Sequence, residues 1–188
     1  HYQFDDFIQL KNNRGTDETR VRHLDYSVVV SKLFWRRLKQ NGVITFFDPN
    51  EVPDLYEAYY RDIKEFERLY ENYEKHPSLK KKVESAEKVF KEWIIKERVE
   101  TGRIYILNID NVQRQSSFDV TTHPIYSSNL CQEITLPTTT FQTIDDPNGR
   151  IALCTLGSIN WGAFKHPSDM RRAVRVLDLG VQPVGPER

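Results

Sequence analysis

One short segment, Ser127 to Ile134, places a cysteine between an amide and a carboxylate and reads SSNLCQEI. In an extended chain alternate side chains share a face, so Asn129, Cys131 and Glu133 would project together at intervals of about 7 Å. Such a trio offers hydrogen-bond donors and acceptors, a redox-active sulfur and a carboxylate that can move a proton. The alternative is a solvent-facing polar edge with an incidental cysteine, because alternation of this kind is common in half-exposed strands.

The second cysteine, Cys154, stands in the apolar stretch Ile151 to Leu156. A free cysteine in an apolar strand is usually a core residue, and its composition favours that interpretation here. A metal site formed by Cys131 and Cys154 with His123 or His166 is a further alternative. No pair of these residues has the close C-x-x-C or H-x-x-x-H spacing typical of zinc, so the spacing does not favour a metal site.

Composition narrows the class of protein. The 188 residues carry 27 basic and 27 acidic side chains, and the resulting net charge of zero provides no general attraction to nucleic acid or to an anionic membrane. No apolar run approaches the roughly 20 residues that span a bilayer, and the first residues lack the pattern of a signal peptide. Two cysteines do not make a disulfide scaffold, so we expect a cytoplasmic protein.

Apolar periodicity predicts strands that alternate with helices, which is typical of the α/β class. Ser31 is predicted to cap a helix that ends at Asn41-Gly42, and a last helix is predicted to start near Ser168 and to bury Met170, Ala173, Val174 and Leu177. A turn is predicted at 145–149. Strands are predicted at 26–30, 43–47, 103–108, 130–136 and 151–156.

The middle of the chain carries two apolar stripes at helical spacing. The first consists of Ile63, Phe66, Tyr70 and Tyr73, and the second of Leu79, Val83, Ala86, Phe90 and Trp93. Because the connection at His76-Pro77 is short, we predict two antiparallel helices packed stripe against stripe. This helical hairpin would span about 59–100, with the second helix ending near Gly102, as an insertion in the α/β fold.

Five segments in order resemble the large, catalytic subunit of class I ribonucleotide reductases. The N-L-C-x-E signature of that family matches residues 129–133, and it is followed by Leu136-Pro137-Thr138 as in the family. The stretch DDPNGRIALCTL at 145–156 resembles the segment with one of the family's redox-active cysteines. The other similar segments are LKNNRG at 10–15, RVRHLDY at 20–26 and TGRIY at 101–105.

The resemblance implies a role for each candidate residue. Cys131 would become a thiyl radical that abstracts the 3′ hydrogen of the substrate ribose, Glu133 would take the 3′-hydroxyl proton, and Asn129 would hydrogen-bond the ribose hydroxyls. Cys154 would be one of two cysteines that supply electrons, and its partner cysteine is absent from this chain. The implied fold is part of a ten-stranded α/β barrel with the radical cysteine on an internal loop, so a loop could replace part of the strand at 130–136.

The resemblance also implies partners and boundaries. Residues 1–178 would form part of a catalytic barrel domain from the middle of the subunit, and 179–188 a divergent, unstructured tail. The partners would be a ribonucleoside diphosphate substrate, a metal-containing small subunit that supplies the radical, thioredoxin or glutaredoxin, and the remaining segments of the large subunit. No cofactor would bind directly, and ATP or dNTP effectors would bind regions outside this chain. The alternative is a non-catalytic remnant, or an interaction module that binds through the helical hairpin.

Overall fold

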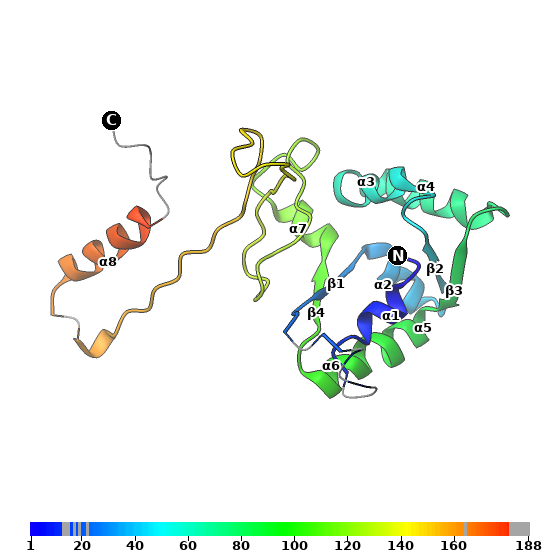
Figure 1. Ribbon diagram of the computed structural model, residues 1–188, viewed down its shortest axis with the longest axis horizontal. Coiled ribbons are helices and arrows are strands. Elements are labelled where there is room, and N and C mark those ends of the chain that lie inside the picture. The colour runs from blue at the N-terminus through cyan, green and yellow to red at the C-terminus, as the bar shows by residue number, and fades with distance from the viewer. Residues whose placement is uncertain (13–15, 17, 19, 22, 164, 181–188) are drawn as a thin grey trace. The chain divides into compact units, whose positions relative to one another are not determined.

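A computed structural model describes residues 1–12, 16, 18, 20–21, 23–163 and 165–180 (Figure 1). The chain divides into two compact units, His1–Thr138 and Thr139–Arg188, which are described separately. Helices and strands are mixed along the chain, so the predicted α/β class is confirmed. The predicted unstructured tail lies outside the described residues from position 181 onward, whereas Leu179 ends a helix.

The first unit contains a pair of parallel strands, β1 (Ser27–Val30) and β4 (Tyr105–Asn108), which run side by side in Figure 1. Their register joins Ser27 to Tyr105 and Val30 to Asn108. The β-branched run of β1 favours this conformation, and its alternate residues Val28 and Val30 are buried. Both strands were predicted close to these bounds.

Helix α2 (Lys32–Lys39) follows β1 directly, with Ser31 at its N-cap position as predicted. The Ser31 side chain makes no capping hydrogen bond, so this part of the prediction is wrong. The helix ends as expected, because Asn41 adopts a left-handed φ of 51°, a conformation that asparagine tolerates better than most residues. Strand β2 (Val43–Phe47) begins one residue after Gly42.

The predicted helical hairpin is wrong. Helix α4 (Ile63–Lys75) carries the first stripe, but it packs with helix α3 (Pro53–Arg61), which was not predicted. Part of the second stripe lies on strand β3 (Lys81–Ser85), which pairs antiparallel with β2. Residues Leu79, Val83 and Ala86 fit helical spacing, yet the open edge of β2 supplies backbone hydrogen bonds that favour a strand.

A long helical segment returns the chain from β3 to β4. It runs from α5 (Ala86–Lys88) through a π-helical stretch η2 (Val89–Ile95) into α6 (Lys96–Thr101), and ends at Gly102 with φ of 68°, where it was predicted to stop. Two short helices complete the first unit, α1 (Phe4–Ile8) and α7 (Ile109–Gln115).

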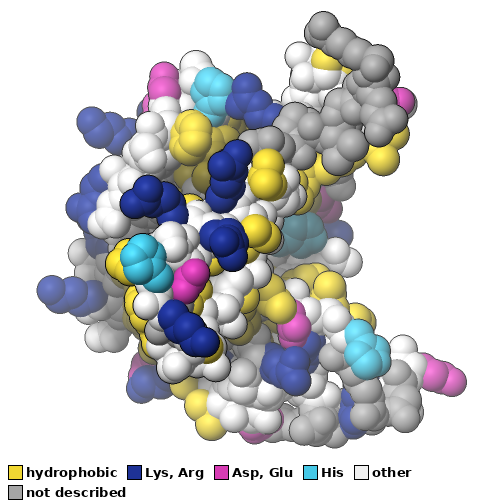
Figure 2. All heavy atoms as spheres, turned by 90° about the vertical axis from the view of Figure 1, so that its left-hand side faces the viewer, with side chains coloured by type: hydrophobic (Ala, Val, Ile, Leu, Met, Phe, Trp, Pro, Cys, Tyr) yellow, Lys and Arg dark blue, Asp and Glu magenta, His cyan; other side chains and the backbone are white. Residues whose placement is uncertain are grey.

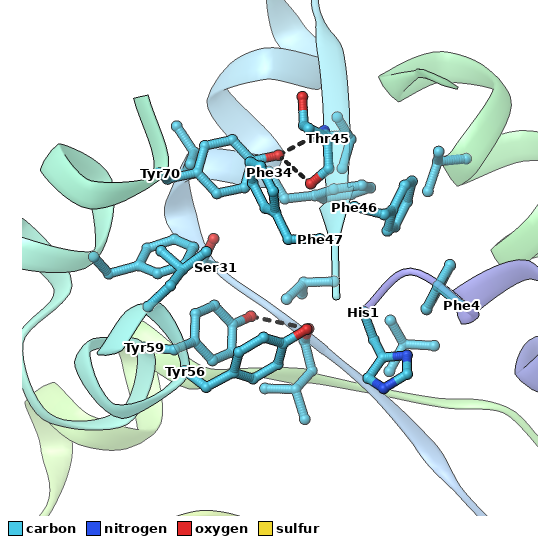
Figure 3. Close-up of a pocket in the computed structure, with 18 of the residues that line it drawn as sticks. His1, Phe4, Ser31, Phe34, Thr45, Phe46, Phe47, Tyr56, Tyr59 and Tyr70 are labelled. Atoms are coloured by element: carbon cyan, nitrogen blue, oxygen red, sulfur yellow. Dashed lines mark hydrogen bonds between the residues drawn. The ribbon is translucent and has the colours of Figure 1, made fainter. Parts of the chain in front are cut away.

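Two hydrophobic clusters form the core of the first unit. One gathers residues of β1, β2 and the helical segment after β3; its buried members include Val30, Phe46 and Val89. The other gathers residues of α3 and α4 around Phe47 and Tyr70. Between aromatic and aliphatic side chains of both clusters lies a cavity of about 270 Å³ (Figure 3).

The second unit has little regular structure apart from a 3-10 turn η3 (Trp161–Ala163) and helix α8 (Pro167–Leu179). Helix α8 was predicted, but Met170 and Val174 are exposed rather than buried, and Ala173 and Leu177 are half-buried. The predicted strand at 151–156 is wrong, because this stretch is exposed and forms no ladder. Figure 2 shows one face of the molecule, on which exposed hydrophobic side chains lie among lysine and arginine side chains.

The predicted ten-stranded barrel is not present as a closed sheet. In the part of the chain that the structure describes, the strands form two separate two-stranded sheets, β1 with β4 and β2 with β3. An isolated bridge between Thr139 and Arg150 adds one antiparallel contact in the second unit, across the turn predicted at 145–149.

A buried tyrosine hydroxyl makes a testable contribution to stability. The Tyr70 hydroxyl donates to the Thr45 carbonyl oxygen over 2.8 Å and accepts from the Thr45 amide over 2.6 Å (Figure 3). We expect Tyr70→Phe to lower the free energy of unfolding by about 1–3 kcal/mol in urea titrations, because it leaves buried polar groups unpaired. In the control Tyr73→Phe, a more exposed hydroxyl that donates to Asp54 is removed, and the expected change is within about 0.5 kcal/mol. Equal losses in both variants would contradict this assignment.

The same residue makes stability depend on pH. Burial raises the pKa of Tyr70 to about 12, above the value of about 10 in an unfolded chain. The contribution of the Tyr70 hydroxyl to the free energy of unfolding is therefore complete below about pH 10. It is lost as the pH rises toward 12, because in that range the tyrosine ionises in the unfolded chain only. We expect Tyr70→Phe to reduce the loss of unfolding free energy between about pH 9 and pH 11.5. An unchanged difference between these two pH values would show that Tyr70 does not titrate in this way.

Candidate active site

The segment that carries Cys131 is anchored at its start by buried side chains. Ile125 is fully buried, and its carbonyl oxygen accepts a hydrogen bond from Gln113 Nε2 of α7 over 2.9 Å. The ring of Tyr126 packs on Tyr60 of α3 with centroids 5.0 Å apart, and its hydroxyl accepts from Arg61 Nη2 over 3.1 Å. Contacts with two helices therefore fix where the following residues begin.

Residues 129–134 form a closed loop. The Asn129 amide donates to the Ile134 carbonyl oxygen over 3.2 Å, and the Ile134 amide donates back to Asn129 Oδ1 over 3.0 Å. Inside this ring the Gln132 amide donates to the Asn129 carbonyl oxygen over 3.1 Å. A turn at Leu130 and Cys131 and a positive φ of 66° at Gln132 reverse the chain between the two ends.

The predicted extended strand at 130–136 is therefore wrong at its start. The alternation that would place Asn129, Cys131 and Glu133 on one strand face is interrupted by the turn. The loop that the resemblance allowed is what the structure has. Cys131 and Glu133 are exposed, and Asn129 is half-buried at the base of the loop. All three residues therefore belong to one turn of six residues, in which the thiol is open to a reactant.

A cavity of about 350 Å³ borders this loop. One wall consists of the residues from Ser127 to Leu130 together with Gln132, and the other of Tyr105 and the residues from Asp25 to Ser27 at the amino ends of β1 and β4. Hydroxyl, amide and carboxylate groups line it together with the Leu130 side chain and the rings of Tyr26 and Tyr105. This composition contrasts with the cavity in Figure 3, whose lining consists largely of core side chains.

Charged residues that the sequence analysis had not singled out support the amino end of β1. Asp25 is ion-paired with the buried side chain of Lys11, and its Oδ1 lies 3.5 Å from Arg103 Nη1. The hydrogen bond from Lys11 holds the pKa of Asp25 below its usual value. All three residues belong to segments that resemble the family, at 10–15, 20–26 and 101–105, and this was the available signal. In LKNNRG, residues 13–15 lie outside the described residues.

Cys154 lies in the second unit, whereas Cys131 lies in the first. Both are free thiols and both are exposed, so the prediction of a buried Cys154 is wrong. The physical reason is that residues 151–156 are exposed and pair with no strand among the residues that the structure describes.

The two histidines considered as metal ligands make other contacts. His123 Nδ1 lies 2.8 Å from the Thr122 hydroxyl, and His166 Nδ1 accepts from the Ser168 amide over 3.2 Å as the N-cap of α8. Among the residues that the structure describes, no group of three or more His, Cys, Asp or Glu side chains is placed to hold a metal ion. In the same residues no helix is both long and apolar enough to cross a bilayer.

Comparison with known proteins assigns the chain to a family of enzyme domains. A family model described as "Ribonucleotide reductase, barrel domain" matches residues 1–182. The chain belongs to this family. The match extends four residues beyond the likeness noticed in the sequence, which ended at about Asp178.

Curated relatives carry the name of one particular subunit. The chain is 42% identical over 182 residues to the ribonucleoside-diphosphate reductase subunit alpha of Buchnera aphidicola, and 44% identical over 182 residues to that of Haemophilus influenzae. Each match covers 95% of this chain and 24% of the relative. A match to ribonucleoside-diphosphate reductase 1 subunit alpha of Escherichia coli is 46% identical over 138 residues, which is 73% of the chain and 18% of the relative. The chain thus spans about a quarter of the length of the first two relatives.

The exposure of both thiols can be tested directly. We expect about two thiols per chain to react with a chromogenic disulfide reagent in the absence of denaturant, because reactivity requires access to the sulfur. Cys131→Ser and Cys154→Ser should each leave one. A thiol that reacts only after denaturant is added would contradict the exposure of that residue.

Proposed function

We propose that this chain is part of the alpha subunit of a ribonucleoside-diphosphate reductase, which converts ribonucleotides to deoxyribonucleotides by thiyl-radical chemistry. The observation that carries the proposal is the closed loop that exposes Cys131 beside Asn129 and Glu133, in a chain of the barrel-domain family. A solvent-open thiol on a turn can meet a substrate carbon, whereas a core cysteine cannot.

Each residue of the loop has a proposed step. The sulfur of Cys131, as a thiyl radical, takes the hydrogen atom from C3′ of the ribose and becomes a thiol. The carboxylate of Glu133 accepts the proton of the 3′-hydroxyl, which requires only a positioned base of suitable pKa. Asn129 holds the ribose hydroxyls by hydrogen bonds, so that the hydrogen and the proton leave from a fixed sugar.

Cys154 is the proposed source of electrons. The 2′-hydroxyl leaves as water, and two thiols together give up two electrons and two protons as they join in a disulfide. Cys131 then returns the hydrogen atom to C3′ and is again a radical. Because the chain has two cysteines and one is the radical site, the partner of Cys154 has to come from another segment of the subunit.

The proposed partners follow from the same scheme. A ribonucleoside diphosphate is the substrate, a metal-containing small subunit supplies the radical, and thioredoxin or glutaredoxin reduces the disulfide. The remaining segments of the alpha subunit complete the ten-stranded barrel. The pairing of β1 and β4 with one strand each, in the described part of the chain, supports the need for such neighbours. We therefore propose that the chain alone is inactive.

The alternative of a non-catalytic interaction module loses its main support. It rested on two apolar helical stripes that could bind a partner. In the first unit the stripe of α4 is covered by α3, with Phe66 and Tyr70 buried, and part of the other stripe belongs to a strand. Helices that are already packed leave less apolar surface for another protein.

The test is turnover in a complete alpha subunit that carries this segment, assembled with a radical-generating small subunit and a thiol reductant. Cys131→Ser is expected to abolish deoxyribonucleotide formation, and Glu133→Gln to lower it about 100- to 10,000-fold, the usual contribution of a general base. Both variants should keep the parent's unfolding midpoint. Ser117→Ala, at an exposed position that does not line the cavity beside the loop, is the matched control and should stay active. Turnover by Cys131→Ser near the parent rate would refute the proposed chemistry.

A further inference from the structure

We infer that Asn129 has a second role besides contact with the substrate: its side-chain oxygen helps to close the loop that carries Cys131, which leaves its NH2 group for the reactant. The inference deepens the proposed function and rests on it for the identity of the reactant. The closure of the loop itself rests only on geometry.

One side-chain atom adds a second link between the two ends of the loop. Two backbone hydrogen bonds start from Asn129, its amide to the Ile134 carbonyl and its carbonyl to the Gln132 amide. The third bond, from the Ile134 amide to Asn129 Oδ1 over 3.0 Å, joins the side chain to the far end of the loop. Asparagine side chains commonly imitate a backbone acceptor in this way and so fix turns.

The identity of the bonded atom follows from chemistry. A backbone N–H can only donate, so the carboxamide must present its oxygen to Ile134 and point its NH2 group elsewhere. Among the described residues, Asn129 Nδ2 makes no hydrogen bond to the protein. Of the three candidate residues, Asn129 lines the cavity beside the loop. Its two N–H donors are therefore available to a ribose oxygen that approaches the loop.

The closed loop determines where the reacting groups lie. Gln132, with its φ of 66°, stands between Cys131 and Glu133, and it keeps this left-handed conformation while the ends of the loop are joined. If the bond to Oδ1 is lost, one backbone bond still joins residues 129 and 134, and the loop opens more readily toward the extended chain that its sequence alternation favours. In the extended chain the spacing of thiol and carboxylate changes, so Asn129 acts on both groups through the backbone.

Two variants separate the roles. Asn129→Asp keeps an oxygen for the Ile134 amide but has no NH2 group, whereas Asn129→Ala removes both. Ser117→Ala, outside both the ring and the cavity lining, is the matched control. The readout is hydrogen exchange of the Ile134 amide in the full chain, where residue 129 is too distant in sequence to alter the intrinsic exchange rate. Turnover is then measured in the complete enzyme.

We expect Asn129→Ala to speed exchange of the Ile134 amide about threefold to tenfold, the equivalent of one lost hydrogen bond. Asn129→Asp should stay within about twofold of the parent, because its carboxylate also accepts from a backbone amide. In the complete enzyme both variants should lose turnover, the aspartate variant with its loop intact. Alkylation of Cys131 should change rate in the alanine variant only.

Several outcomes would overturn the inference. Unchanged exchange in Asn129→Ala, or equally fast exchange in both variants, would mean that Oδ1 does not close the loop. Full turnover by Asn129→Asp would mean that the NH2 group is not the substrate contact. Failure of the proposed function is distinct, because an active Cys131→Ser enzyme would refute the radical chemistry and leave the exchange results unaffected.

Discussion

The parallel pairing of β1 with β4 is the constraint on which the rest of the first unit depends. Parallel strands cannot be joined by a hairpin, so the chain has to cross from the carboxyl end of β1 to the amino end of β4. Everything from α2 to α6 forms this crossover. At the carboxyl ends, the Lys32 amide donates to Asp110 Oδ2 over 2.6 Å, and Trp35 Nε1 donates to Asn108 Oδ1 over 2.7 Å. The start of the crossover is thus tied to the last residue of β4 and to a residue just after it.

The same strand pair positions the candidate site. After α7 the chain turns back, is held at Ile125 and Tyr126, and brings the Cys131 loop beside the amino ends of both strands. The fold therefore supplies one wall of the cavity and the loop supplies the other. Asp25 with its two basic neighbours supports that wall by charge, and the Tyr26 ring supports it by packing on Phe7.

Strong local signals made about half of the fold predictable. The valines of β1, the asparagine that ends α2 and the glycine that ends the helix before β4 each encode a conformation on their own. Strand β3 lacked such a signal, because its lysines and glutamate become a strand only through pairing with β2. The start of α3 had an available signal in Pro53, a residue suited to the first helical position.

The candidate site was predictable in composition but not in geometry. The motif located Asn129, Cys131 and Glu133, but simple alternation placed them on a strand. Asparagine at the first position of the segment was a signal for a turn, since its side chain competes for backbone hydrogen bonds. The exposure of Cys154 could not be read from apolar neighbours, because those neighbours find no cover within residues 139–180.

The sequence separation of β1 and β4 has a consequence for the order of folding. Paired residues of the two strands lie 78 positions apart, so the entropy cost of closing a long loop precedes any gain from their hydrogen bonds. Helices α3 and α4 are adjacent in sequence and can associate at much lower entropic cost. We therefore expect α3 and α4 to associate early in folding and β1 and β4 to pair late. The Cys131 loop lies beside the amino ends of that strand pair, so we expect it to become ordered last.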